Sequence, residues 1–158
     1  MEFIAKRITR NYCQTINSTP DKIFPLICPV REAEWLDGWD YKMIYSKTGY
    51  AEEGAVFTTS YEGEEDTIWI ITIHDPINYK VEFVRVTPAS RASILSVNIR
   101  EKDLKSSYVD ITYIYTSFTT AGNRFIEEYT EEVFLDMVKH WENSVNYFLD
   151  TGKKLNGK

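Results

Sequence analysis

The chain has 158 residues, a formal net charge of −6 and an apolar fraction of 43%. This length suits one domain over residues 1–158, and the composition is that of a globular protein rather than a disordered one. The acidic balance argues against a nucleic-acid partner, and no apolar run approaches the roughly 18–20 residues that membrane insertion requires. The charged N-terminal segment is unlike a secretory signal, so we expect a cytoplasmic protein.

Residues that commonly bind metals are few and dispersed in this sequence: Cys13, Cys28, His74 and His140. None falls in a CxxC, HxxxH or HExxH spacing, so the sequence predicts no metal site and no cofactor. Cys28 has no evident base to activate it and is expected to be a small buried residue. Aromatic residues reach 15%, which favours a large core or an aromatic-lined pocket.

The N-terminal part of the chain predicts one strand followed by two short helices. β-Branched and aromatic residues between Phe3 and Asn17 favour the strand. Thr19 can cap a first helix that begins at Pro20, because proline suits the first helical position. A second helix can run from Pro29 to Trp35, ending before Gly38.

The middle of the chain, from Trp39 to Phe118, predicts about six strands. Alternating apolar and polar residues and β-branched runs are separated there by short turns. The predicted strands are Tyr41–Tyr45, Ala55–Thr59, Thr67–Ile73, Tyr79–Arg85, Ser93–Arg100 and Tyr108–Phe118. Short connections between successive strands predict an antiparallel meander.

The last segment predicts one long amphipathic helix from about 124 to 151. Apolar residues recur there at intervals of three and four: Ile126, Tyr129, Val133, Met137, Trp141, Val145 and Phe148. Asn123 can cap its start and Gly152 its end, and its length would be about 42 Å at 1.5 Å per residue. A sheet that curls around such a helix tends to leave a ligand cavity between them.

Four stretches of the chain carry a resemblance to a known family. They are Ser18–Phe24, Cys28–Trp39, Gly54–Thr59 and Thr116–Thr119 with Gly122. Together they resemble the START/Bet v 1-like (SRPBCC) superfamily, in its polyketide cyclase/dehydrase and lipid-transport branch, and the middle two resemble an uncharacterised prokaryotic subgroup. The resemblance implies an α+β helix-grip fold, a curved antiparallel sheet wrapped around a long C-terminal helix. Members include lipid carriers, plant hormone and flavonoid binders, aromatase/cyclases and chaperone ATPase activators.

Nine residues are candidates to contact a ligand in the cavity. They are Trp35, Trp39, Trp69, Phe83, Arg85, Tyr113, Phe134, Met137 and Trp141. Trp35 and Trp39 could form a gate or a stacking surface at the cavity mouth, although the sequence favours a role in closing one end of the barrel as core. The remaining aromatic residues and Met137 are expected to point inward, some of them as core and some toward a ligand.

The polar candidates each have two interpretations. Arg85 could pair with a ligand carboxylate or phosphate if its strand face points inward, but the sequence favours a strand-end position with the guanidinium in water. Glu32 and Glu34 could provide acid–base chemistry, yet are expected on a solvated face or at the barrel rim. His74 is expected at the surface, and His140 could face the cavity edge but is expected elsewhere.

Three functions remain open at this point. Binding or carriage of a small hydrophobic or amphipathic molecule is favoured, because aromatic residues are plentiful and no catalytic constellation is evident. A cyclase/dehydratase-type enzyme acting on a polyketide-like substrate would be favoured by a polar cluster with perturbed titration inside the cavity. An interaction module like the chaperone ATPase activators would be favoured by a filled interior and an exposed apolar patch. The expected partner is a small hydrophobic ligand, and the sequence leaves a homodimer open.

Overall fold

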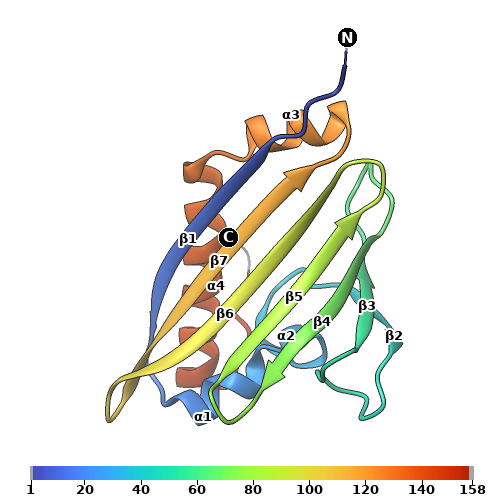
Figure 1. Cartoon of the computed structure of the whole chain (residues 1–158). Coiled ribbons are helices and arrows are strands. Elements are labelled where there is room, and N and C mark those ends of the chain that lie inside the picture. Colours follow the sequence, from blue (N-terminus) through green and yellow to red (C-terminus); the bar gives the residue numbers. More distant parts are fainter. Residues whose placement is uncertain (1, 157–158) are drawn as a thin grey trace.

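The computed structural model describes residues 2–156 and contains one curved antiparallel sheet with the helices on its concave side (Figure 1). The strands are β1 (Arg7–Ile16), β2 (Tyr41–Tyr45), β3 (Val56–Thr59), β4 (Thr67–Asp75), β5 (Lys80–Thr87), β6 (Arg91–Asp103) and β7 (Ser106–Ser117). Their spatial order is β1-β7-β6-β5-β4-β3-β2. The predicted meander is therefore confirmed for β2 to β7, and β1 closes the order by pairing with β7.

Two short helices follow β1, as predicted. They are α1 (Pro20–Ile23) and α2 (Pro29–Trp35), with a 3-10 turn η1 (Phe24–Leu26) between them. Each of these two helices has proline in its first turn, where the missing N–H would have no helical acceptor anyway. The α2 helix ends at Trp35, and Gly38 then takes the left-handed conformation at φ 80°.

The single helix predicted over about 124–151 is wrong, because the chain forms two helices there. They are α3 (Thr120–Glu128) and α4 (Glu131–Thr151). Thr119 caps α3 by accepting a hydrogen bond from the Gly122 N–H at 3.1 Å, and Thr130 caps α4 in the same way. Asn123 is therefore inside α3 rather than at its start, whereas Gly152 ends α4 at φ 71° as predicted.

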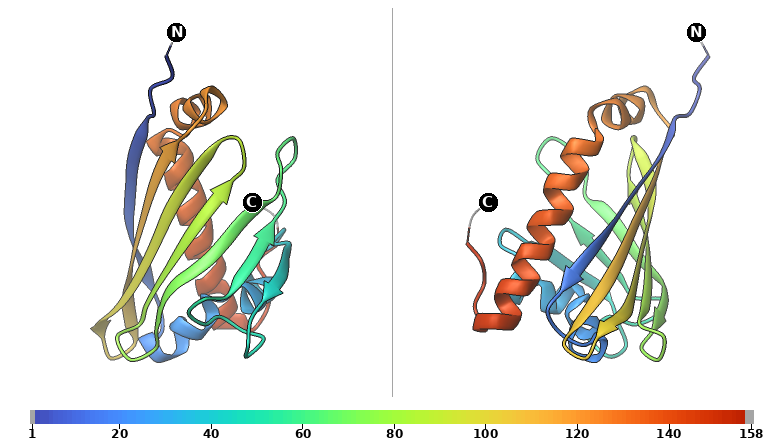
Figure 2. Two further views of the ribbon diagram at one scale, coloured as in Figure 1. Left: turned by 45° about the vertical axis from the view of Figure 1, so that its right-hand side comes forward. Right: turned by 90° about the vertical axis from the view of Figure 1, so that its left-hand side faces the viewer.

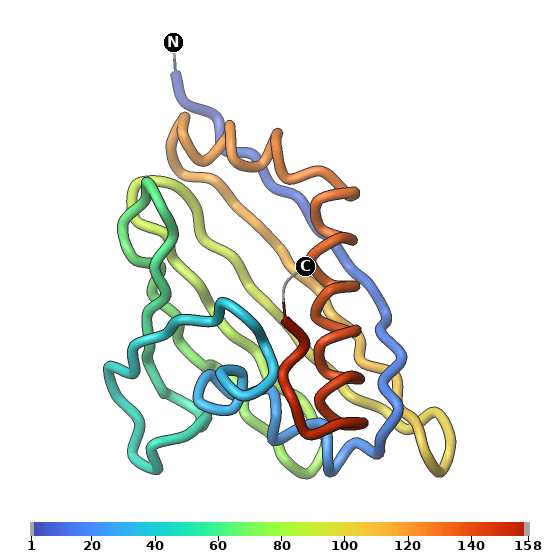
Figure 3. The backbone as a smooth tube through the Cα atoms, turned by 180° about the vertical axis from the view of Figure 1, so that it is seen from behind, coloured from blue at the N-terminus to red at the C-terminus, as the bar shows by residue number. Residues whose placement is uncertain are grey.

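The α4 helix lies diagonally across the concave side of the sheet and is fixed mainly to β1 (Figures 2 and 3). The Gln14 amide donates to the Val138 carbonyl at 2.9 Å. The Glu142 carboxylate accepts from the Tyr12 hydroxyl at 3.0 Å and from the Thr15 N–H at 2.6 Å. These bonds hold α4 against β1, at one edge of the sheet.

No helix within residues 2–156 is both long enough and apolar enough to cross a membrane.

Candidate functional site

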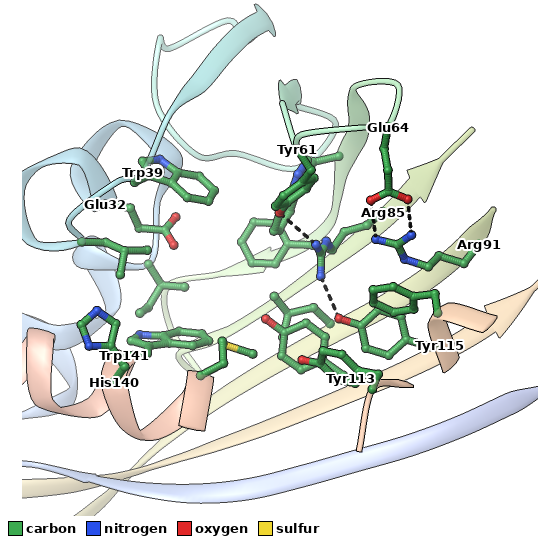
Figure 4. A pocket seen from close by; sticks show the side chains of 18 residues that line it. Glu32, Trp39, Tyr61, Glu64, Arg85, Arg91, Tyr113, Tyr115, His140 and Trp141 are labelled. Atoms are coloured by element: carbon green, nitrogen blue, oxygen red, sulfur yellow. Dashed lines mark hydrogen bonds and ion pairs between the residues drawn. The ribbon is translucent and has the colours of Figure 1, made fainter. Parts of the chain in front are cut away.

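A cavity of about 400 Å³ lies between the concave face of the sheet and the helices (Figure 4). Its volume is within the range of about 300–1,000 Å³ that is typical of small-molecule sites. The lining comes from α2, α3, α4, four strands and the loops beside them. The lining residues are Ile27, Glu32, Leu36, Trp39, Tyr61, Glu64, Trp69, Phe83, Arg85, Arg91, Leu95, Tyr113, Tyr115, Phe125, Tyr129, Met137, His140 and Trp141.

The structure brings most of the predicted site residues together at this cavity. Those that line it are Trp39, Trp69, Phe83, Arg85, Tyr113, Met137 and Trp141. Trp35 and Phe134 do not line it, because both are fully buried behind the wall. Trp35 stacks on Trp141 with ring centroids 6.3 Å apart, and Phe134 packs edge-on against Tyr113 at 5.9 Å. Their place is the core that supports the lining.

One wall of the cavity is a cluster of aromatic rings around Trp69. The Trp69 ring stacks on Phe57 with ring centroids 5.1 Å apart. It meets Trp39 and Phe83 edge-on, with centroid distances of 5.9 and 5.6 Å. Its indole N–H donates to the Thr59 hydroxyl at 2.8 Å, so its polar atom is satisfied. This wall presents flat apolar surface to whatever occupies the cavity.

A second aromatic wall comes from β7 and α3. The rings of Tyr113 and Tyr115 stack in parallel with their centroids 5.6 Å apart. The Tyr129 ring centroid lies 4.9 Å from that of Tyr115, and the Phe125 ring stacks on Tyr129 with centroids 5.3 Å apart. Burial raises the pKa of both Tyr113 and Tyr129. Their hydroxyls therefore stay neutral at physiological pH and can act as hydrogen-bond donors.

Arg85 lies inside the cavity, so the expectation that its guanidinium reaches water at the strand end is wrong. The β5 strand continues to Thr87, and the inward face of the strand includes position 85. The guanidinium stacks 4.3 Å from the Trp69 ring centroid and donates to the hydroxyls of Tyr115 and Tyr61, each at 3.3 Å. Its Nε atom is buried without a hydrogen-bond partner in residues 2–156.

A second arginine of the lining is paired. Arg91 begins β6 and is buried, and its Nη atoms contact the Glu64 carboxylate at 2.7 and 3.3 Å. The Arg91 guanidinium also lies 3.4 Å from the Phe125 ring centroid. This ion pair connects the β3–β4 loop to the opposite wall and leaves neither charge uncompensated.

Glu32 also lines the cavity, and the expectation that it lies on a solvated face or at the barrel rim is wrong. No hydrogen bond or ion pair joins its carboxyl group to the other lining residues (Figure 4). Burial raises its pKa from 4.5 to about 8, so the group is mostly protonated at neutral pH. His140 faces the same cavity from α4, contrary to the expectation that it lies elsewhere. Glu34, by contrast, is exposed and pairs with Arg31.

The remaining polar candidates lie outside the cavity. His74 packs against the Phe24 ring at 5.1 Å, and partial burial lowers its pKa. Cys28 is buried, as predicted, and its sulfur accepts a hydrogen bond from the Ala51 N–H at 3.3 Å. Within the part of the chain that the structure describes, no group of three or more His, Cys, Asp or Glu residues could hold a metal ion.

Some lining residues were not identified as candidates from the sequence. Arg91 shares the inward parity of Leu95 on β6, so the alternation of that strand could have found it. Tyr61 and Glu64 lie in the β3–β4 loop, and a loop has no sequence periodicity from which the direction of its side chains could be predicted. Phe125 lies in α3, and Tyr129 directly follows the last residue of α3 at the break before α4, which the apolar stripe conceals.

The chain matches no model of a known protein family, and no curated protein matches it. Solved structures do match. The truncated norcoclaurine synthase from Thalictrum flavum has a TM-score of 0.68 at 9% identity, covering 100% of this chain and 99% of that one. The same enzyme in complex with dopamine and hydroxybenzaldehyde has a TM-score of 0.63 at 12% identity, covering 98% and 90%. The Zhui aromatase/cyclase from a Streptomyces species has a TM-score of 0.63 at 8% identity, covering 95% and 100%.

The chain has the helix-grip fold of START/Bet v 1-like proteins. At sequence identities this low, the similarity to the solved structures concerns the fold alone. The fold agrees with the one that the sequence resemblance to that superfamily implies. A fold does not by itself determine a function, which depends on the residues of this cavity.

Proposed function

We propose that this protein binds or carries a small hydrophobic or amphipathic molecule in the cavity between the sheet and α4. The observation that carries the proposal is the cavity of about 400 Å³, half of whose lining residues are Phe, Tyr or Trp. Transfer of apolar ligand surface into such a site is favourable by about 25 cal/mol per Å². The norcoclaurine synthase structure that holds dopamine and hydroxybenzaldehyde supports small aromatic occupants for this fold.

A cavity-filling substitution tests this function. Met137 lines the cavity from α4, so Met137→Trp should place an indole in the space that a ligand would occupy. We expect the neutral fluorescent probe N-phenyl-1-naphthylamine to bind the wild-type protein and not Met137→Trp, with the stability of the variant nearly unchanged. Lys139→Trp places the same side chain on an exposed position of α4 and should bind the probe like the wild type.

Two results together would contradict the proposal. They are a wild-type protein that fails to bind the probe, and a Met137→Trp variant that loses about 1–3 kcal/mol of unfolding free energy through overpacking. The interaction-module hypothesis needs a filled interior, so it would gain from the same pair of results.

A second candidate function is proton transfer to or from a bound molecule, as in a cyclase/dehydratase-type enzyme with a polyketide-like substrate. Glu32 favours it, because a cavity-facing carboxyl group with a pKa of about 8 can give and take a proton near neutral pH. If so, a ligand recovered from the wild-type protein should change chemically on incubation with it. Glu32→Gln should bind the same ligand and leave it unchanged, whereas a ligand that the wild type never alters would eliminate this candidate.

A further inference from the structure

Arg85 is a half-buried cation of the cavity lining, with its Nε atom fully buried, and it lacks an acidic partner. Arginine stays charged at physiological pH and carries five N–H donors. Two of these donors reach the hydroxyls of Tyr115 and Tyr61, each at 3.3 Å, and both acceptors are uncharged groups. None of the ion pairs within residues 2–156 includes Arg85. A charge that is partly removed from water is costly unless it is paired, so an anion bound here would be favourable.

The two carboxyl groups in the cavity lining do not neutralise Arg85. The Glu64 carboxylate already accepts hydrogen bonds from both Nη atoms of Arg91, at 2.7 and 3.3 Å. Glu32 faces the cavity from α2, and its raised pKa of about 8 keeps it mostly uncharged at neutral pH. The lining therefore holds one permanent positive charge without compensation, set among aromatic side chains (Figure 4).

The surroundings of Arg85 also orient its guanidinium. The group lies 4.3 Å from the Trp69 ring centroid and 5.7 Å from that of Tyr113, so aromatic faces hold its plane. Each Nη atom has a second N–H beyond the one that reaches a tyrosine. Two donors on a planar guanidinium match the two oxygens of a carboxylate, and a lysine in this place would offer no such fork.

We propose that the ligand is an amphipathic monoanion, an aromatic or otherwise apolar body that carries one carboxylate, and that this carboxylate pairs with Arg85. The inference rests on the proposed binding function and specifies the ligand class. One uncompensated guanidinium calls for one negative charge, and a dianion such as phosphate would bring an excess charge into an apolar site. The apolar body would lie against Trp39, Trp69 and Trp141, which line the same cavity.

Two probes of equal shape test the inference. 2-Naphthoate and 2-naphthamide share one ring system and differ in charge. Near pH 6 the naphthoate is ionised, because carboxyl groups in water have a pKa of about 4, whereas Glu32 remains protonated. We expect calorimetry to show that the wild-type protein binds the naphthoate at least about tenfold more tightly than the naphthamide.

Variants then assign the preference to one side chain. Arg85→Met should bring the ratio of the two affinities close to one, and Arg85→Lys should retain part of the ratio. Arg100→Met is the matched control, because Arg100 is exposed on β6 and pairs with Asp110 outside the cavity. It should keep the full preference.

The outcomes separate this inference from the function on which it rests. Equal affinity of the wild-type protein for both probes would overturn the inference and leave the binding function in place. Failure of both probes to bind would contradict the binding function, and the inference with it. A preference that persists in Arg85→Met would also overturn the inference. The first comparison uses the wild-type protein, so the test does not depend on the folding of a variant.

Discussion

Two glutamates of α2 have opposite surroundings although they lie two positions apart. Glu34 is exposed and pairs with Arg31 at 2.7 Å, whereas Glu32 faces the cavity. Residues two positions apart on a helix point about 200° apart, so one can point into water while the other points into the cavity. Burial disfavours the charged carboxylate, and the pKa of Glu32 rises to about 8 for that reason.

The raised pKa of Glu32 predicts a pH-dependent stability. The unfolded chain loses this proton near pH 4.5, while the folded protein keeps it until about pH 8. The stability that Glu32 contributes is therefore fully present below pH 4.5 and is lost as the pH rises through about 8. The loss amounts to about 1.4 kcal/mol for each pH unit between these values. Urea unfolding across this range should show a steeper decline for the wild type than for Glu32→Gln.

The matched control for this prediction is Glu34→Gln on the exposed face of the same helix, which should decline with pH as the wild type does. Stability curves of wild type and Glu32→Gln that run parallel from pH 5 to 8 would show that Glu32 is solvated in the folded protein.

For single side chains, the sequence predicts apolar lining better than polar lining. Strand alternation indicates the inward faces, and Trp69, Phe83 and Tyr113 do line the cavity. The assumption that a charged side chain stays in water fails for Arg85 and Glu32, because both face an internal space whose existence depends on the whole fold. Alternation carries no information about that space.

The periodicity of the sequence does not predict the break between α3 and α4. Ile126, Tyr129 and Val133 continue the apolar stripe across it, so periodicity shows no interruption. The backbone of Tyr129 leaves the helical region at φ −84° and ψ 69°. A signal was present at Thr130, a good N-cap residue that precedes two acidic residues in the first turn of α4.

The close packing of α3 against the sheet predicts that a larger side chain at Gly122 lowers the free energy of unfolding. Gly122 is buried in α3, and a Cβ atom there would overlap the backbone carbonyl oxygen of Ser90. Gly122→Ala should therefore push α3 away from the sheet and lower the unfolding free energy by about 1–3 kcal/mol, measured by urea unfolding. Glu128→Ala, at an exposed position of the same helix, should change it little. Equal stability of Gly122→Ala and wild type would contradict the close packing.

The position of the cavity in the molecule follows from where α4 is attached. Its hydrogen bonds go to β1 at one edge of the sheet, and the sheet curves away toward β3 and β4 (Figure 2). The sequence and its family resemblance predicted this architecture, and the solved structures of the same fold agree. The volume and polar groups of the cavity could not be predicted, because they depend on how particular side chains pack. The homodimer that the sequence leaves open stays a prediction.

The proposed function requires that the cavity holds a small molecule. Native mass spectrometry of the protein, purified gently from its expression host and compared with its denatured mass, tests this most directly. We predict an adduct of a few hundred daltons that is lost on denaturation and is absent from Met137→Trp. An adduct that persists in Met137→Trp, or a wild-type protein that remains free of ligand even after incubation with an excess of 2-naphthoate, would contradict the account.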